Sequence, residues 1–227
     1  HNNPLCISGI RFVPVKLIDV AGLVPGAHEG KGLGNQFLDD ARQAEVLIHV
    51  VDISGSTDIQ GQSVNVGTHD PREDIKFAEE EFDFWFKQIL EREWQKLSKE
   101  IEKTKTKLVD GIADRFSGLG VKVNHVHEVL QNLGLLTKKP VEWNNSDLTK
   151  FAQMLRKKTK PMLIAANKAD LCKSLEITNE IHKNREIINC SAETELLLKK
   201  AAKADLIEYI PGNEKFVINK NVDISAP

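Results

Sequence analysis

The chain has 227 residues, 41% of them hydrophobic and 28% charged, with 31 basic against 33 acidic side chains. Such a length and composition suit one large or two small globular domains and exclude a disordered tail. The net charge of -2 excludes a global attraction to nucleic acid or to an acidic membrane. Its apolar runs are far shorter than the roughly 20 residues of a membrane helix, so we expect no contact with a membrane. The three cysteines are far apart, as in a reducing compartment, which predicts a cytoplasmic protein.

Four short apolar segments have the form of buried strands in a parallel sheet. They span residues 12–19, 45–52, 161–167 and, more weakly, 186–190. Strands without clean polar alternation are usually covered on both faces by helices. Residues 36–43 have a helical pattern and complete a strand, helix, strand unit. The expected fold class is therefore α/β, with a mostly parallel sheet and helices on both faces.

The middle of the chain has a helical pattern. Asp70 is the expected N-cap of a helix and Pro71 its first residue. Apolar residues then recur at steps of three and four as far as Ile112, which predicts one long amphipathic helix. Shorter helices are expected over residues 123–133 and 147–157. This region is predicted to be an antiparallel helical module set inside the α/β domain.

Two motifs follow expected strands, and the first is Asp-Val-Ala-Gly at residues 19–22. In P-loop hydrolases, an Asp at this place organises magnesium, and the Gly three residues on donates its N–H to the γ-phosphate. Other Asp-x-x-Gly matches begin at Asp52 and Asp58, but only the first leads into a glycine-rich loop. The prediction is that Asp19 holds Mg²⁺ through water and that Gly22 binds the γ-phosphate.

The second motif, Asn-Lys-Ala-Asp at residues 167–170, is far more specific. The Asp170 carboxylate can accept hydrogen bonds from guanine N1–H and from the exocyclic amine, whereas adenine has no such donor pair. The stem of Lys168 can pack on the base face, and Asn167 can tie the loop to neighbouring elements. The backbone N–H groups expected to complete the pocket at guanine O6 are those of Ser191 and Ala192.

These motifs carry a resemblance to a known family. The stretch DVAGLVPGAHEGKGLGN at residues 19–35 resembles the switch II signature of the Obg-related GTPases. With FLDDAR, THDPREDI, NKAD, SAE and IEYIPGNEKF, the chain is similar to the YchF subfamily, most closely to its archaeal members. The resemblance implies a P-loop NTPase G domain interrupted by a coiled-coil-like helical insertion. It also implies a C-terminal TGS domain and nucleotide hydrolysis linked to ribosomes.

On this basis the chain divides into a G domain in two parts, an insertion and a linker. The parts are residues 1–66 with switch II, the helical insertion at 67–158, residues 159–216 with the base-recognition motifs, and 217–227 as a linker towards a C-terminal domain. The sequence contains no Gly-x-x-x-x-Gly-Lys-Ser/Thr phosphate loop. We therefore expect an interior portion of a longer protein, in which hydrolysis needs the full-length chain.

Three alternatives stay open. Leu23 stands where Ras-like enzymes carry the Gln that orients water, so His28 is the candidate catalytic group, with K⁺ or the substrate's own phosphate as competitors. The residues of the base motif favour GTP, whereas the family resemblance also allows ATP. The chain could also be a non-catalytic interaction module that presents the helical insertion to a partner.

The helical insertion is the region predicted to contact a partner. Trp85, Phe86 and Trp94 lie at helical spacing and are expected in its core. One face of the long helix could meet the ribosome or another RNA through a row of lysines. Interleaved glutamates favour instead a solvated, ion-paired face. The lysines of this row are Lys96, Lys99, Lys103 and Lys107.

Overall fold

The structure is a computed structural model that describes residues 6–7, 10–11, 13–20, 40–172 and 176–219. Its central sheet has three parallel strands in the order β3–β4–β5. They are β3 (Leu47–Asp52), β4 (Met162–Asn167) and β5 (Ile187–Asn189). This confirms the expected strands at 45–52, 161–167 and 186–190. Asp52 is opposite Asn167 in the register, so polar residues meet at the carboxyl ends of two neighbouring strands.

Residues 13–20 do not form the expected first strand. Val13, Val15 and Leu17 are each 75% exposed, and the segment has no strand partner among the described residues. A strand is stable only where its backbone N–H and C=O groups meet those of a neighbour. The strand prediction for 12–19 is thus wrong in this structure. The described strands upstream are the short antiparallel pair β1 (Cys6–Ile7) and β2 (Ile10–Arg11).

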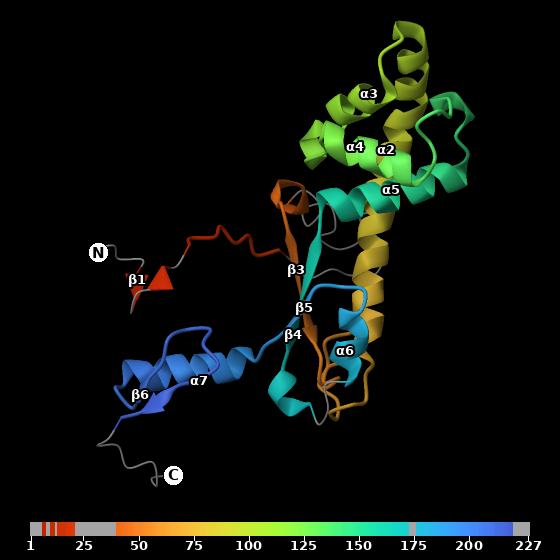
Figure 1. The fold of residues 1–227 in the computed structure, drawn as a ribbon. Helices are drawn as coiled ribbons and strands as arrows, with labels where there is room; N and C mark the ends of the chain where they lie inside the picture. Colours follow the sequence, from red (N-terminus) through yellow and green to blue (C-terminus); the bar gives the residue numbers. More distant parts are fainter. Residues whose placement is uncertain (1–5, 8–9, 12, 21–39, 173–175, 220–227) are drawn as a thin grey trace.

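Four helices lie between β3 and β4 in the sequence. They are α2 (Pro71–Thr104), α3 (Leu108–Arg115), α4 (Val123–Asn132) and α5 (Asn145–Thr159), with short turns at Ser117–Leu119 and Pro140–Glu142. The Asp70 side chain accepts the Arg72 N–H at 3.0 Å and caps α2 as expected. Figure 1 shows α3 and α4 beside the far end of α2, while α5 leads back towards the sheet. Together, α2 to α5 and their connections are called the helical module below.

The long helix predicted from residue 71 to beyond residue 112 is in fact two helices. Helix α2 ends at Thr104, Lys105 takes a left-handed conformation with φ 56°, and α3 folds back against α2. Gly111 allows this close approach, because a Cβ at that position would lie 3.0 Å from Cγ1 of Ile101. The apolar spacing continues across the break since both helices bury their apolar faces in one core. Periodicity alone therefore could not locate the turn.

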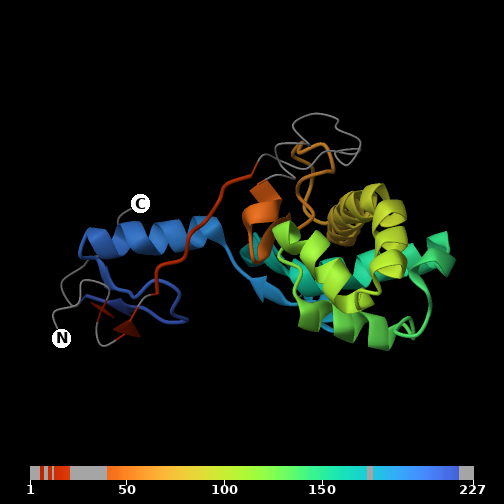
Figure 2. The same cartoon turned by 90° about the horizontal axis from the view of Figure 1, so that it is seen from above.

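The remaining elements belong to the second part of the α/β domain. They are α6 (Glu176–His182), α7 (Ala192–Lys203), β6 (Ile207–Glu208), β7 (Val217–Ile218) and a short turn at Ala169–Leu171. Strands β6 and β7 pair with each other and lie beside α7, to one side of the sheet (Figures 1 and 2). Residues 40–43 are helical, the described end of the helix expected over 36–43.

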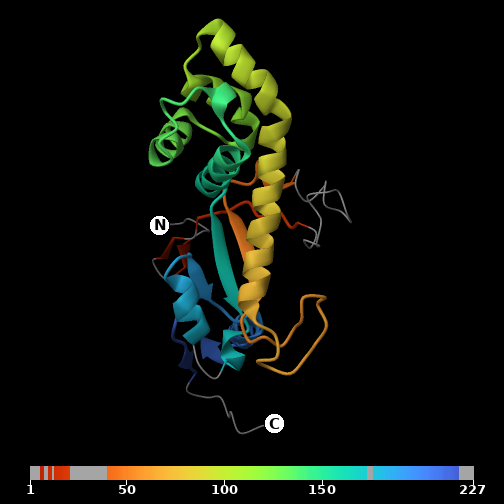
Figure 3. The ribbon, with the colours of Figure 1, turned by 90° about the vertical axis from the view of Figure 1, so that its right-hand side faces the viewer.

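Helix α2 belongs to two cores. Near its start, Ile75 packs with Val51 and Ile164 of the sheet. Farther along, Trp85, Phe86 and Trp94 are buried in the helical module, which confirms their expected place in the core. Figure 3 shows α2 passing along both regions. One long helix thus joins the sheet to the module.

The described helices cover one face of the sheet. Ile75 of α2 and Ile181 of α6 are buried on that face. On the other face Ile48, Val50 and Ile188 are 53%, 63% and 56% exposed. Helix α7, whose described side chains include no buried residue, does not cover them. Within the described part of the chain, no helix is both long and apolar enough to cross a membrane.

Candidate functional site

The loop that follows β4 carries the base motif. Asn167 is the last residue of β4, and Lys168 has a left-handed backbone with φ 60° and ψ 30°. For a residue with a Cβ this conformation costs roughly 1–2 kcal/mol of conformational free energy, so contacts with its surroundings must stabilise it. The turn at Ala169–Leu171 follows directly and places the Asp170 side chain in solvent. The carboxylate is therefore free to meet a ligand at the carboxyl end of the sheet.

Asn167 joins three loops at this end of the sheet. Its side-chain Oδ1 accepts the N–H of Ala192 at 2.9 Å, and its backbone C=O accepts the N–H of Ile53 at 3.0 Å. The N–H of Ala169 donates to the C=O of Cys190 at 3.1 Å. The loops after β3, β4 and β5 are therefore held side by side, which is where open α/β sheets bind ligands.

Ser191 and Ala192 begin helix α7 beside the base motif. The Ser191 Oγ accepts the Thr194 N–H at 3.2 Å and caps the helix. The Ala192 N–H already donates to Asn167, so in this structure it is not free for guanine O6. Helix α7 begins at Ala192, so the positive end of its dipole lies at this end of the sheet.

The Lys168 side chain ends in a cluster of oxygens from the loop after β3. Its Nζ donates to Asp52 Oδ2 at 2.7 Å, to Ser56 Oγ at 3.0 Å and to Thr57 Oγ1 at 3.0 Å. Ser54 donates to Asp52 Oδ1 from its N–H at 3.0 Å and from its Oγ at 2.5 Å. Asp52 was passed over in the sequence because it matched only a common motif. Its place at the end of an expected strand was the only sequence signal for it, since its position opposite Asn167 appears in the fold alone.

The pKa of Asp52 reflects this cluster. Burial by itself raises the pKa of the carboxyl, but hydrogen bonds from Lys168, Ser54, Thr57 and Ser56 outweigh burial and hold it well below its usual range. The carboxylate is therefore charged at neutral pH. Together with Lys168 it forms an ion pair whose side chains are 12% and 39% exposed.

The residues predicted to bind phosphate and magnesium are not gathered here. Asp19 is exposed in the segment 13–20, and Gly22 and His28 lie outside the described residues. A carboxylate oxygen suits Mg²⁺, but no group of three or more His, Cys, Asp or Glu side chains forms a metal site among the residues that the structure describes. Of the residues predicted to bind magnesium, phosphate or the attacking water, the structure describes Asp19 alone.

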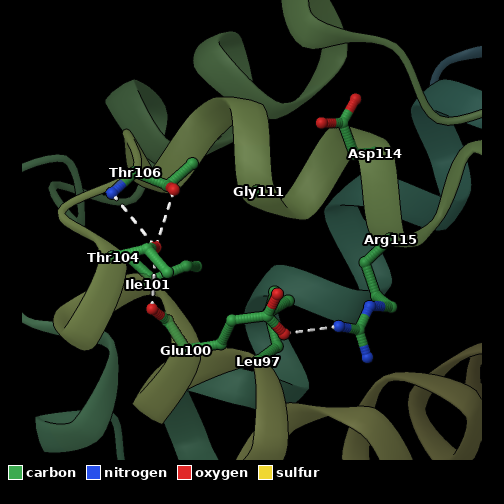
Figure 4. Close-up of a pocket in the computed structure, with 8 residues that line it drawn as sticks. All are labelled: Leu97, Glu100, Ile101, Thr104, Thr106, Gly111, Asp114 and Arg115. Carbon is green, nitrogen blue, oxygen red and sulfur yellow. Dashed lines mark hydrogen bonds and ion pairs between the residues drawn. The ribbon is translucent and has the colours of Figure 1, made fainter.

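Two hollows in the described part of the structure lie away from the base motif. A pocket of about 370 Å³ lies between α2 and α3, and Arg115 on its wall donates to Glu100 at 2.7 Å (Figure 4). A smaller one of about 210 Å³ adjoins it and is lined in part by Arg42 and Phe116. Both belong to the helical module or its edge, and neither includes a residue of the 167–170 loop. The candidate base site is therefore identified by its polar groups and not by either of these pockets.

Two family models match parts of the chain. The model described as "Obg-like GTPase YGR210-like, G4 motif-containing domain" matches residues 165–227, which include the whole base motif. The model described as "50S ribosome-binding GTPase" matches residues 6–81. The first match lies after the helical module, whereas the second ends within its first helix, α2.

Similar proteins agree with these models. The chain is 44% identical over 209 residues to an uncharacterized GTP-binding protein of Methanocaldococcus jannaschii, covering 91% of this chain and 52% of that protein. The crystal structure of a GTP-binding protein from Pyrococcus horikoshii is similar with a TM-score of 0.68 and 47% identity, over 77% of this chain and 51% of the other. The chain thus spans about half the length of these relatives.

The likeness to YchF is more distant. The ribosome-binding ATPase YchF of Buchnera aphidicola is 49% identical, but over 47 residues only, which are 21% of this chain and 13% of that protein. The comparisons therefore support the broader Obg-related group and not the YchF subfamily in particular.

Proposed function

The chain belongs to the Obg-related P-loop GTPases, and from this premise we propose that it carries the guanine-recognition part of a nucleotide-dependent switch. In this proposal Asp170 accepts from guanine N1–H and the exocyclic amine. Lys168 packs its stem on the base, Asn167 holds the loops together, and the first turn of α7, which begins after Ser191 and includes Ala192, faces O6. GTP is the nucleotide, rather than ATP.

One observation carries the proposal: the exposed Asp170 carboxylate lies beside the start of α7, in a loop that Asn167 fastens through the Ala192 N–H at 2.9 Å. An acceptor and the positive end of a helix then lie next to each other. Guanine offers the matching set, namely two donors beside the acceptor O6. Adenine has neither the N1–H nor the 2-amino group, so it would leave the carboxylate unpaired, and it presents an amine where guanine has the acceptor O6.

The test is a change of base preference in the full-length protein. Asp170→Asn exchanges an acceptor for a donor, which matches the second carbonyl oxygen of xanthine. We expect GTP affinity to fall by at least about 100-fold and XTP affinity to rise. Asp205→Asn, a change at the exposed end of α7, is the control and should leave both affinities unchanged. If wild-type protein bound ATP as tightly as GTP, base recognition by Asp170 would be refuted.

We also propose that the full-length protein hydrolyses GTP with Mg²⁺ organised by Asp19 and the γ-phosphate bound by Gly22. His28 is the proposed group that orients water, with K⁺ as the competing candidate. Support comes from the family, since the relevant loop lies outside the described residues. GTP turnover by His28→Ala, measured in Na⁺ and in K⁺ buffers, separates the two. Loss of turnover in both buffers points to His28, and dependence on K⁺ alone points to the cation.

A ribosome or RNA contact through the helical module is a further part of the proposal. Lys96, Lys99 and Lys103 are exposed on α2, whereas Lys107 lies beyond its end, at the N-cap of α3. Glu93 and Glu100 pair with Arg115 at 2.8 and 2.7 Å. The pairing of Glu93 and Glu100 with Arg115 and not with these lysines supports an RNA contact over an ion-paired face. Charge reversal of these three lysines should abolish co-sedimentation of the full-length protein with ribosomes. Unchanged binding and salt dependence would remove RNA as a partner.

A further inference from the structure

The ammonium group of Lys168 has all its donors engaged within the protein. It has three N–H groups, and three oxygens surround it: Asp52 Oδ2 at 2.7 Å, and Ser56 Oγ and Thr57 Oγ1 at 3.0 Å each. No donor is left over for a phosphate or for a base edge. What Lys168 still offers to a nucleotide is the side of its methylene stem.

The oxygens that bind the Lys168 ammonium, called the anchor below, are those of Asp52, Ser56 and Thr57, and they are also hydrogen-bonded to one another. The hydroxyls of Ser56 and Thr57 donate to Asp52 Oδ2 at 2.8 and 2.7 Å and accept from Lys168, so each uses its proton and a lone pair. Ser54 occupies the other carboxylate oxygen. A charge-assisted network with every member satisfied holds its side chains in one arrangement.

The place of this anchor matters for the base pocket. Asp52 ends β3 directly opposite Asn167, one residue before Lys168. The Lys168 side chain is nevertheless 39% exposed, so the stem can be reached from solvent. Its left-handed backbone turns the chain sharply between the strand and Asp170. An anchor at the Nζ end is therefore what sets the direction of the stem.

We propose that Asp52 is a positioning residue for guanine-nucleotide binding, which fixes the ammonium end of Lys168 so that the methylene stem lies ready against the base. This inference rests on the proposed function. Asp52 touches no nucleotide atom itself and acts only through Lys168. Because the anchor is at the base end of the site, GDP and GTP benefit equally.

The test compares two charge-removing variants of one loop in the full-length protein. Asp52→Asn keeps the shape of the side chain but loses the ion pair. Asp58→Asn is the matched control, since Asp58 Oδ1 accepts the backbone N–H groups of Gln60 and Gln62 in the same loop. With fluorescent GDP and GTP, we expect Asp52→Asn to raise both Kd values about three- to tenfold and Asp58→Asn less than twofold.

A double-mutant cycle separates positioning from a general effect on folding. Lys168→Met keeps most of the stem but loses the ammonium. If Asp52 acts through Lys168, adding Asp52→Asn to Lys168→Met should change Kd by less than twofold. An equal loss in both backgrounds would overturn the proposal. So would tighter binding by Asp52→Asn, because the ion pair would then compete with the nucleotide.

A milder variant covers the case in which Asp52→Asn does not fold, as judged by circular dichroism. Ser56→Ala with Thr57→Val removes two of the three acceptors and leaves the carboxylate in place. We expect Kd to rise about two- to threefold, again equally for GDP and GTP, and an unchanged Kd would count against the anchor.

If wild-type protein binds no guanine nucleotide, the proposed function fails first. If wild type binds and the Asp52 and Asp58 variants behave alike, only this inference fails.

Discussion

The helical module and the sheet are built from different kinds of contact. Among the described residues, the core that contains the module has 22 buried hydrophobic residues, whereas the core on the covered face of the sheet has six. Nearly all of the larger core comes from one continuous stretch of chain, and helices satisfy their backbone internally. The sheet joins residues 47–52, 162–167 and 187–189, which are far apart in the sequence. The module therefore depends on local packing and the sheet on distant segments.

The two regions meet at a buried lysine. Lys160, between α5 and β4, is 3% exposed, and its Nζ donates to the backbone oxygens of Arg42 and Ala44 at 2.7 and 2.6 Å. Burial lowers its pKa. Next to it Ala41, 1% exposed, belongs to the core of the module. The segment that ends the expected switch II region is thus attached to the module as well as to the sheet.

The largest expected effect is in the core of the module. Phe151 is fully buried, with its ring centroid 5.2 Å from that of Trp143. Phe151→Ala should lower the free energy of unfolding by about 3–5 kcal/mol, because it leaves a cavity. Urea unfolding of this chain measures it, with Phe216→Ala, at a residue 49% exposed, as the control. A loss below about 1 kcal/mol would mean that the module is not the better-packed region.

Two adjacent residues of β3 test whether the sheet is packed on one face. Val51 is 2% exposed and Val50 is 63% exposed. Val51→Ala should cost about 2 kcal/mol, from the loss of buried methyl groups, and Val50→Ala less than about 0.5 kcal/mol. Thermal and urea unfolding give both values. Equal losses at the two positions would show that the second face is covered in solution.

The junction should show an intermediate effect. Lys160→Met keeps the stem but leaves the carbonyl groups of Arg42 and Ala44 without their donor, which should cost about 1–2 kcal/mol. Lys158→Met is the control, since Lys158 pairs with Glu128 at 2.7 Å with both side chains at least 44% exposed. That change should cost less than about 0.5 kcal/mol. If the two variants unfold alike, the buried lysine does not join the regions.

The smallest effect is a dependence on pH at the end of the sheet. The folded-state pKa of Asp52 is depressed, so its stabilising contribution is complete above the unfolded pKa of about 4 and falls away in more acidic solution. Between pH 6 and pH 3 this single group should account for about 1 kcal/mol of lost stability. The difference between wild type and Asp52→Asn isolates it, and should shrink by that amount on acidification. A difference that stays constant would contradict the assigned pKa direction.

Sequence reasoning succeeded where a local pattern determines local structure. The segments around β3, β4 and β5 are short, apolar and bounded by turns, and Asp70 with Pro71 marks the start of α2. It failed where the outcome depends on a neighbour. Residues 12–19 have a strand composition, but their described part, 13–19, has no strand partner among the described residues. The break at Lys105 is invisible in the sequence because α2 and α3 bury their apolar faces in one core.

The candidate site divides in the same way. The Asn-Lys-Ala-Asp motif was found from its rarity and its place after a strand, because its chemistry belongs to the residues themselves. Asp52 was missed, since its importance comes from the register that places it opposite Asn167. The use of the Ala192 N–H by Asn167 was also hidden, because these residues lie 25 positions apart and meet only in the fold.

The sequence by itself determined the family, the parallel strands and the residues with the chemistry to read guanine, because these follow from composition and short motifs. Only the tertiary structure decided where the long helix breaks, which face of the sheet is covered and which groups hold Lys168. The length, charge balance and composition of the 227 residues limit which side chains can be buried or hydrogen-bonded. Which of these contacts form depends on the pairing of strands that are far apart in the sequence, and that pairing is decided only by the fold.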